Sequence, residues 1–183
     1  MATETFTPTE AAAFLEFPER QIRKEVEHGL FSTKLDFSAL VYLETLRGLG
    51  LNLGVDDRRK LFEIVTREMD RNRTAPDLVS FSPVMILRLG PIVREIRHRV
   101  ERFTTWKTKL TIDPNVLGGE TVFPNSRLSV RSVGALLERG ASQESIREDY
   151  PYLDHEDLEF ARVFVRAYPR VGRPRETGQT PAR

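Results

Sequence analysis

The sequence has no cysteine, which excludes disulfide scaffolds, thiolate zinc sites and cysteine nucleophiles. It also lacks long hydrophobic runs: the longest strictly apolar stretch is residues 11–15, far shorter than the ~20 residues of a membrane span. The first ten residues carry two acids and no basic segment, unlike a secretory signal peptide. We therefore expect a soluble, cytoplasmic protein that does not bind a membrane.

Groups for catalysis or metal binding are equally scarce. The three histidines, His28, His98 and His155, are far apart in sequence, and none pairs with another at helical spacing. The pair Gly118–Gly119 lacks the surrounding pattern of a phosphate-binding loop and is more typical of a tight turn. We expect no enzyme activity, no metal site and no cofactor.

Charge is nearly balanced over the 183 residues, with 28 Lys and Arg against 27 Asp and Glu, so no global field attracts the protein to nucleic acid. Locally the balance shifts. Residues 166–183 hold five arginines and one acid, and residues 88–102 hold five arginines and two acids. In the second segment, an ordinary solvated helix face explains the pattern as well as a binding surface does.

The N-terminal segment predicts two short, closely linked helices. Thr7, Pro8 and Glu10 are typical of a helix start with a capping box. A second helix is predicted over residues 18–28, with Ile22 and Val26 inward, and Gly29 follows it. Its outer face is basic. Such a pair describes a helix-turn-helix, whose predicted DNA-binding residues are Arg20, Gln21, Arg23 and Lys24. The alternative is that these are solvated helix charges.

Further helices are predicted over residues 37–47, 56–70 and 91–105, with a polar boundary at 71–77 and a short strand at 84–87. In the 91–105 helix the expected apolar stripe is Ile92, Ile96, Val100 and Phe103. Small strands are expected at 110–112, 121–123 and 128–130. Ser129, Ser142 and Asp154 are each typical N-caps of a C-terminal helix.

The last predicted helix, residues 155–168, is apolar on two sides. A helix of that kind usually packs on its own domain and on something else. We expect the surplus to form a homodimer contact, although a core position is the alternative for the two phenylalanines. The predicted interface residues are Leu158, Phe160, Ala161, Phe164, Val165 and Tyr168.

Two segments resemble known families. The run from residue 113 to 153 resembles the domain of unknown function 433 (DUF433) family. The matching positions are Asp113, Pro114, Gly119, Val122, Arg127, Val130, Gly140, Tyr150, Pro151 and Leu153. Upstream, the run from Thr7 to Ala12 (TPTEAA) resembles the opening of the helix-turn-helix in MerR-type regulators.

The order of the two segments resembles VapB-like antitoxins that contain the 433 domain. The implied fold is mainly α with a few short strands, an N-terminal helix-turn-helix and a C-terminal three-helix domain. The predicted divisions are residues 1–76 for the helix-turn-helix and its supporting helices, 77–168 for a connector and the 433-type domain, and 169–183 for a basic flexible tail.

The resemblance implies an antitoxin of a type II toxin–antitoxin system. Such a protein inhibits a PIN-like ribonuclease toxin and represses its own operon by binding operator DNA. Arginine pairs bidentately with carboxylates, so one arginine of the tail would occupy the toxin's metal site. The predicted toxin-binding residues are Arg170, Arg173 and Arg175. The alternative readings are arginines that contact solvent or DNA phosphates, and a stand-alone transcription regulator whose C-terminal domain only dimerises.

Overall fold

The computed structural model describes residues 4–71, 77–114 and 116–170, and this part of the chain is mainly helical with short strands, as predicted. Eight helices and two antiparallel strand pairs occur in it. The helices are α1 (Pro8–Leu15), α2 (Glu19–Glu27), α3 (Phe37–Leu49), α4 (Val55–Arg71), α5 (Leu89–Lys109), α6 (Val130–Glu138), α7 (Gln143–Asp149) and α8 (His155–Ala167). The strands are β1 (Val79–Ser82), β2 (Met85–Leu87), β3 (Thr111–Ile112) and β4 (Thr121–Val122). None of these helices is long and apolar enough to cross a bilayer.

The start of the chain forms the helix pair that the sequence predicts. The Thr7 hydroxyl accepts a hydrogen bond from the Glu10 N–H, and the Glu10 carboxylate accepts one from the Thr7 N–H, so the capping box is complete. Helix α1 ends at Glu16 in the left-handed region, and α2 begins after Pro18. An isolated bridge between Phe6 and Leu35 closes the unit.

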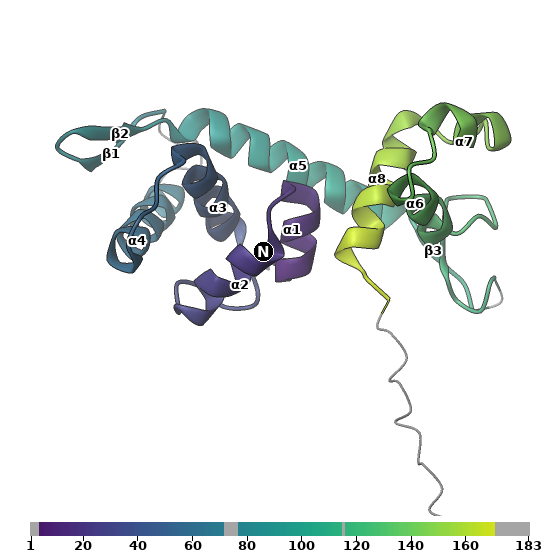
Figure 1. Cartoon of the computed structure of the whole chain (residues 1–183), viewed down its shortest axis with the longest axis horizontal. Helices are drawn as coiled ribbons and strands as arrows, with labels where there is room; N and C mark the ends of the chain where they lie inside the picture. The colour runs from purple at the N-terminus through teal and green to yellow at the C-terminus, as the bar shows by residue number, and fades with distance from the viewer. Residues whose placement is uncertain (1–3, 72–76, 115, 171–183) are drawn as a thin grey trace, which may run out of the picture.

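Helix α5 is the longest helix and joins the two ends of the molecule. Figure 1 shows it passing above α1 and α3, from the β1–β2 hairpin to the group formed by α6, α7 and α8. It begins two residues before Pro91. Its apolar stripe is rotated from the predicted one, since Ile92 and Val100 are only partly buried. The buried side chains are Leu89, Val93, Ile96, Phe103 and Trp106.

The C-terminal helices begin where the sequence predicts. Side chains of Ser129, Ser142 and Asp154 each accept a hydrogen bond from the backbone N–H three residues later. Helices α6 and α8 pack so closely at Gly134 that a Cβ there would lie 2.1 Å from the Ala161 carbonyl oxygen. The strand pair β3–β4 and a bridge from Val122 to Ser129 precede α6.

The second apolar side of α8, which motivated the predicted homodimer contact, is covered within the chain. Helix α8 packs on α6 and on α1. The Phe160 ring stacks on Trp106 of α5 with centroids 4.6 Å apart. Four of the six predicted interface residues are buried, and the other two, Val165 and Tyr168, are partly buried. The apolar surface of α8 that motivated the homodimer prediction is covered by α1 and α5 of the same chain.

Candidate nucleic-acid interface

The outward face of α2 carries all four predicted DNA-binding side chains. Arg20, Gln21, Arg23 and Lys24 are all exposed. Arg23 is engaged locally, since its Nε lies 2.8 Å from Glu19 Oε1. Arg20 and Lys24, four residues apart, form no ion pair with any residue that the structure describes. A shallow hollow runs between the five side chains of Glu19, Arg20, Arg23, Lys24 and Glu27.

The inward face of α2 is held by a buried carboxylate that sequence reasoning missed. Glu25 is 3% exposed. The Tyr42 hydroxyl of α3 donates a hydrogen bond to Glu25 Oε2 at 3.0 Å, and Arg58 of α4 forms an ion pair with Oε1. Burial raises the pKa of Tyr42, and the charge of Glu25 raises it further. The sequence expectation placed Val26 inward beside Ile22, but Val26 is only partly buried.

The spacing of residues along α2 did indicate that Glu25 lies on the buried face. Glu25 lies three residues after Ile22, and side chains three apart share one helix face. A carboxylate on the face that is buried requires a partner, because an unpaired buried charge is strongly destabilising. Those partners come from α3 and α4, so the spacing alone did not identify them.

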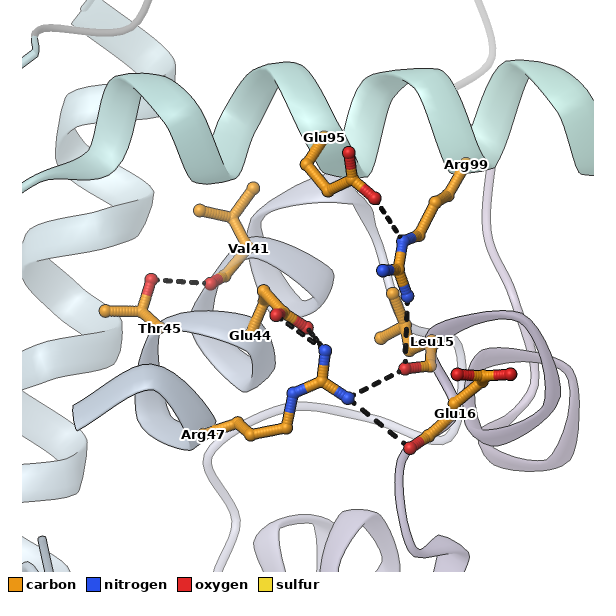
Figure 2. Close-up of polar contacts among 8 residues, drawn as sticks. All are labelled: Leu15, Glu16, Val41, Glu44, Thr45, Arg47, Glu95 and Arg99. Atoms are coloured by element: carbon orange, nitrogen blue, oxygen red, sulfur yellow. Dashed lines mark hydrogen bonds and ion pairs between the residues drawn. The ribbon is translucent and has the colours of Figure 1, made fainter. Parts of the chain in front are cut away.

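The turn between α1 and α2 is held by two arginines from other helices, as Figure 2 shows. The Leu15 carbonyl oxygen accepts hydrogen bonds from Arg47 Nη1 of α3 at 3.0 Å and from Arg99 Nη1 of α5 at 3.3 Å. The two arginines donate hydrogen bonds to free carbonyl groups at the end of α1, and their positive charge interacts favourably with the negative end of the helix dipole. Glu95 binds Arg99 Nε at 2.7 Å, and this hydrogen bond lowers the pKa of Glu95.

The first turn of α1 is attached to both α5 and α8 through Glu10. Its Oε1 accepts a hydrogen bond from the Tyr168 hydroxyl at 2.5 Å and lies 3.0 Å from Lys107 Nζ. Burial raises the pKa of Glu10, but hydrogen bonds from the Thr7 N–H, Tyr168 and Lys107 outweigh it and hold the pKa below its ordinary value. Burial also raises the pKa of Tyr168, as does its bond to Glu10. Helix α1 is therefore anchored at both ends.

Of the three predicted toxin-binding arginines, only Arg170 lies among the described residues. It is exposed, and its Nη2 lies 2.6 Å from Glu120 Oε1 in the segment before β4. The pKa of Glu120 is lowered by a hydrogen bond from the Ser129 hydroxyl and by Arg170. Arg173 and Arg175 lie outside the described residues, and so does most of the predicted tail.

Metal-binding clusters are absent from the described part of the chain: no three His, Cys, Asp or Glu side chains gather there in a way that could hold an ion. The three histidines also stay separate. His155 contacts Gln143 and Glu159, while His98 lies on α5 and His28 ends α2.

Comparison with known protein families identifies one domain in the chain. A DUF433 domain, described as a protein family of unknown function, occupies residues 110–165, which confirms that part of the sequence resemblance. The chain is also similar to the uncharacterized protein y4eO of Sinorhizobium fredii, with 28% identity over 147 residues. That match covers 76% of this chain and 65% of the relative, so the chain spans less than two thirds of that protein's length.

Among solved structures, the chain matches the crystal structure of Rv2018 from Mycobacterium tuberculosis. The TM-score is 0.37 and the identity 15%, over 88% of this chain and 98% of that one. A likeness at this level carries no conclusion about fold or function.

Proposed function

We propose that this chain is a DNA-binding repressor of the antitoxin type. Helix α2 binds operator DNA, and the C-terminal half binds and inhibits a PIN-like ribonuclease. The observation that carries the DNA half is the pair Arg20 and Lys24, two exposed cations without ion pairs among the described residues, on a helix whose opposite face is held by Glu25. A recognition helix needs this combination, because it must present side chains to the major groove from a rigid support.

The partner half rests on the resemblance of residues 113–153 to antitoxins with a DUF433 domain. Helices α6 to α8 contain no cluster of side chains that could hold a metal ion, and most of their apolar residues pack within the chain. A regulator whose C-terminal domain only dimerises is less favoured, since the α8 surface that would carry the dimer is covered by α1 and α5.

The DNA half is tested with the segment upstream of the protein's own gene in gel-shift titrations at two salt concentrations. The variant Arg20→Ala/Lys24→Ala should bind more weakly, and its salt slope should fall by about 2, since each lost phosphate contact contributes roughly 0.9. The matched control, Arg139→Ala/Arg147→Ala, removes the same charge from two exposed cations elsewhere. An equal loss of DNA affinity in both variants would show that only the net charge of the protein matters, and it would contradict the assignment of DNA binding to α2.

The partner half is tested by co-expression with a PIN-like protein encoded beside this gene, followed by copurification and an RNA-cleavage assay. Chain truncated after Arg170 keeps the Tyr168 bond to Glu10, so it separates the role of residues 171–183 from that of the folded domain. If the truncated chain no longer blocks cleavage, the arginines at 173 and 175 inhibit, as the sequence predicts. Failure of the full chain to bind the PIN-like protein would favour the stand-alone regulator.

A further inference from the structure

Two hollows beside α8 differ in how their arginines are neutralised. A cleft of about 320 Å³ lies between α1, α5 and α8. Every arginine that lines it pairs with a glutamate; these are Arg99, Arg102, Arg162 and Arg166. The second hollow, a groove of about 500 Å³ between α6 and α8, has three arginines and no carboxylate among its lining residues. We call it the α6–α8 groove.

The floor of the α6–α8 groove is aliphatic and rigid. Ala135, Leu136 and Val165 line it, and Leu136 is 42% exposed although it lies on a helix with a well-packed inner face. Helices α6 and α8 are closely packed at Gly134, where the backbone of α8 lies in the space that a side chain would need. An aliphatic side chain entering the groove would therefore meet a preformed surface, which lowers the entropy cost of binding.

The rim of the groove is cationic. Arg131 is held in place by its Nη1 hydrogen bond to the Tyr168 carbonyl oxygen at 2.7 Å and by the Phe164 ring, whose centroid is 5.5 Å from the guanidinium carbon. Arg139 forms no ion pair with any of the described residues. Arg170 is paired with the half-buried carboxylate of Glu120. Glu120 also interacts electrostatically with Arg131, but neither Arg131 nor Arg139 has an ion pair among the described residues, so both can attract a carboxylate from outside.

We propose that the α6–α8 groove is the docking site for an acidic amphipathic segment of a protein partner. An aliphatic side chain of that segment packs on Leu136 and Val165, and its flanking carboxylates pair with Arg131 and Arg139. A protein rather than a nucleic acid is favoured because the lining contains no aromatic ring on which a base could stack. The assignment of the segment to the PIN-like partner rests on the proposed function; the chemistry of the groove does not.

The first experiment uses a fluorescein-labelled helical peptide of about 18 residues, with leucine repeating at the i, i+3, i+4 and i+7 positions and glutamate beside it. Fluorescence anisotropy should detect binding to the full chain. Leu136→Asp and Arg139→Glu should each weaken binding by roughly tenfold or more, in keeping with the loss of a central contact. The matched controls Leu117→Asp and Arg147→Glu, at exposed positions of the same half, should bind like the parent.

Four results would overturn the proposal. The acidic peptide could fail to bind, or bind the groove variants as tightly as the parent. A peptide with lysine in place of glutamate could bind equally well. A single-stranded DNA of similar length could bind with the same dependence on Arg139 and Leu136, which would make the groove a phosphate site. Because Arg139 is exposed, Arg139→Glu should retain the fold even if Leu136→Asp does not.

The second experiment repeats the copurification with the PIN-like protein, using the same four variants. Capture by the parent and the controls but not by Leu136→Asp or Arg139→Glu supports the groove as the docking site. Capture by all four variants overturns the groove while the antitoxin function stands. Conversely, peptide binding at the groove without any capture of the PIN-like protein by the parent means that the proposed function fails and the groove serves another acidic partner.

Discussion

Glu25 and Glu10 are both buried carboxylates that accept a hydrogen bond from a tyrosine hydroxyl and pair with a cation, yet they connect different parts of the molecule. The partners of Glu25 are Tyr42 and Arg58, which come from α3 and α4 beside α2. Glu10 instead binds Lys107 on α5 and Tyr168 at the end of α8, 158 residues away. One carboxylate therefore holds the predicted recognition helix within its own unit, and the other attaches that unit to α5 and to the end of α8.

The difference shows how the same chemistry can serve two levels of structure. Loss of the Glu25 contacts should disturb the position of α2 directly. Loss of the Glu10 contacts should leave α2 in place and weaken the attachment of α1 to α8. Four predictions test this contrast, in order of decreasing effect on stability.

Glu25→Ala should be the most destabilising change, because it leaves Arg58 largely buried without its partner. Removing one member of a buried ion pair typically costs about 3–5 kcal/mol of unfolding free energy. Urea unfolding measures the loss, and gel shift should show weakened DNA binding as well. Glu27→Ala, at an exposed position on the same helix, is the control and should be nearly neutral. A cost for Glu25→Ala as small as that of Glu27→Ala would disprove the anchoring role.

Gly134→Ala should destabilise the DUF433 side of the comparison by about 1–3 kcal/mol, the usual range for overpacking. Its new Cβ would lie 2.1 Å from the Ala161 carbonyl oxygen, so α6 and α8 must move apart. The matched control is Gly48→Ala in α3, where nothing lies within 4 Å of the new Cβ; there the substitution should be neutral or stabilising by roughly 0.5–1 kcal/mol. Thermal unfolding of both variants checks the sign, and equal effects at the two glycines would contradict the packing argument.

Tyr168→Phe should cost about 1.5 kcal/mol, as expected for a hydrogen bond to a charged acceptor. In a double-mutant cycle with Glu10→Gln, the two effects should be non-additive because the residues share one contact. Tyr152→Phe, at an exposed ring, serves as the control. Additive effects of the Tyr168 and Glu10 variants would show that the contact does not connect α1 with α8.

The pH dependence of stability should differ between the parent and Glu10→Gln. Since the folded-state pKa of Glu10 is below its ordinary value of 4.5, its contribution is present above pH 4.5 and is lost as the pH falls through the folded-state pKa. Between neutral pH and strong acid, the parent should therefore lose more stability than Glu10→Gln, a difference that urea unfolding at several pH values detects. Parallel curves for the two proteins would contradict a lowered pKa for Glu10.

The sequence predicted local features well where the physics is local. The capping box of Thr7 and Glu10, and the caps at Ser129, Ser142 and Asp154, depend on hydrogen bonds that span three residues, so the pattern of residue types identifies them. The exposure of Arg20 and Lys24 followed in the same way from the 3.6-residue period of α2.

The rest depended on contacts between residues far apart in sequence. The apolar stripe of α5 is rotated from the predicted one, and the sequence did not identify what covers the second side of α8, because periodicity shows that a face is apolar but not which helix covers it. The second role of Glu10 was equally hidden: its capping bond spans three residues, whereas its bond to Tyr168 spans 158. Sequence by itself thus determined the side-chain caps at which α1, α6, α7 and α8 begin and which side of α2 is basic. Only the tertiary structure decided what Glu10, Glu25 and α8 contact, because the free energy of those contacts arises from surfaces that meet after the helices pack.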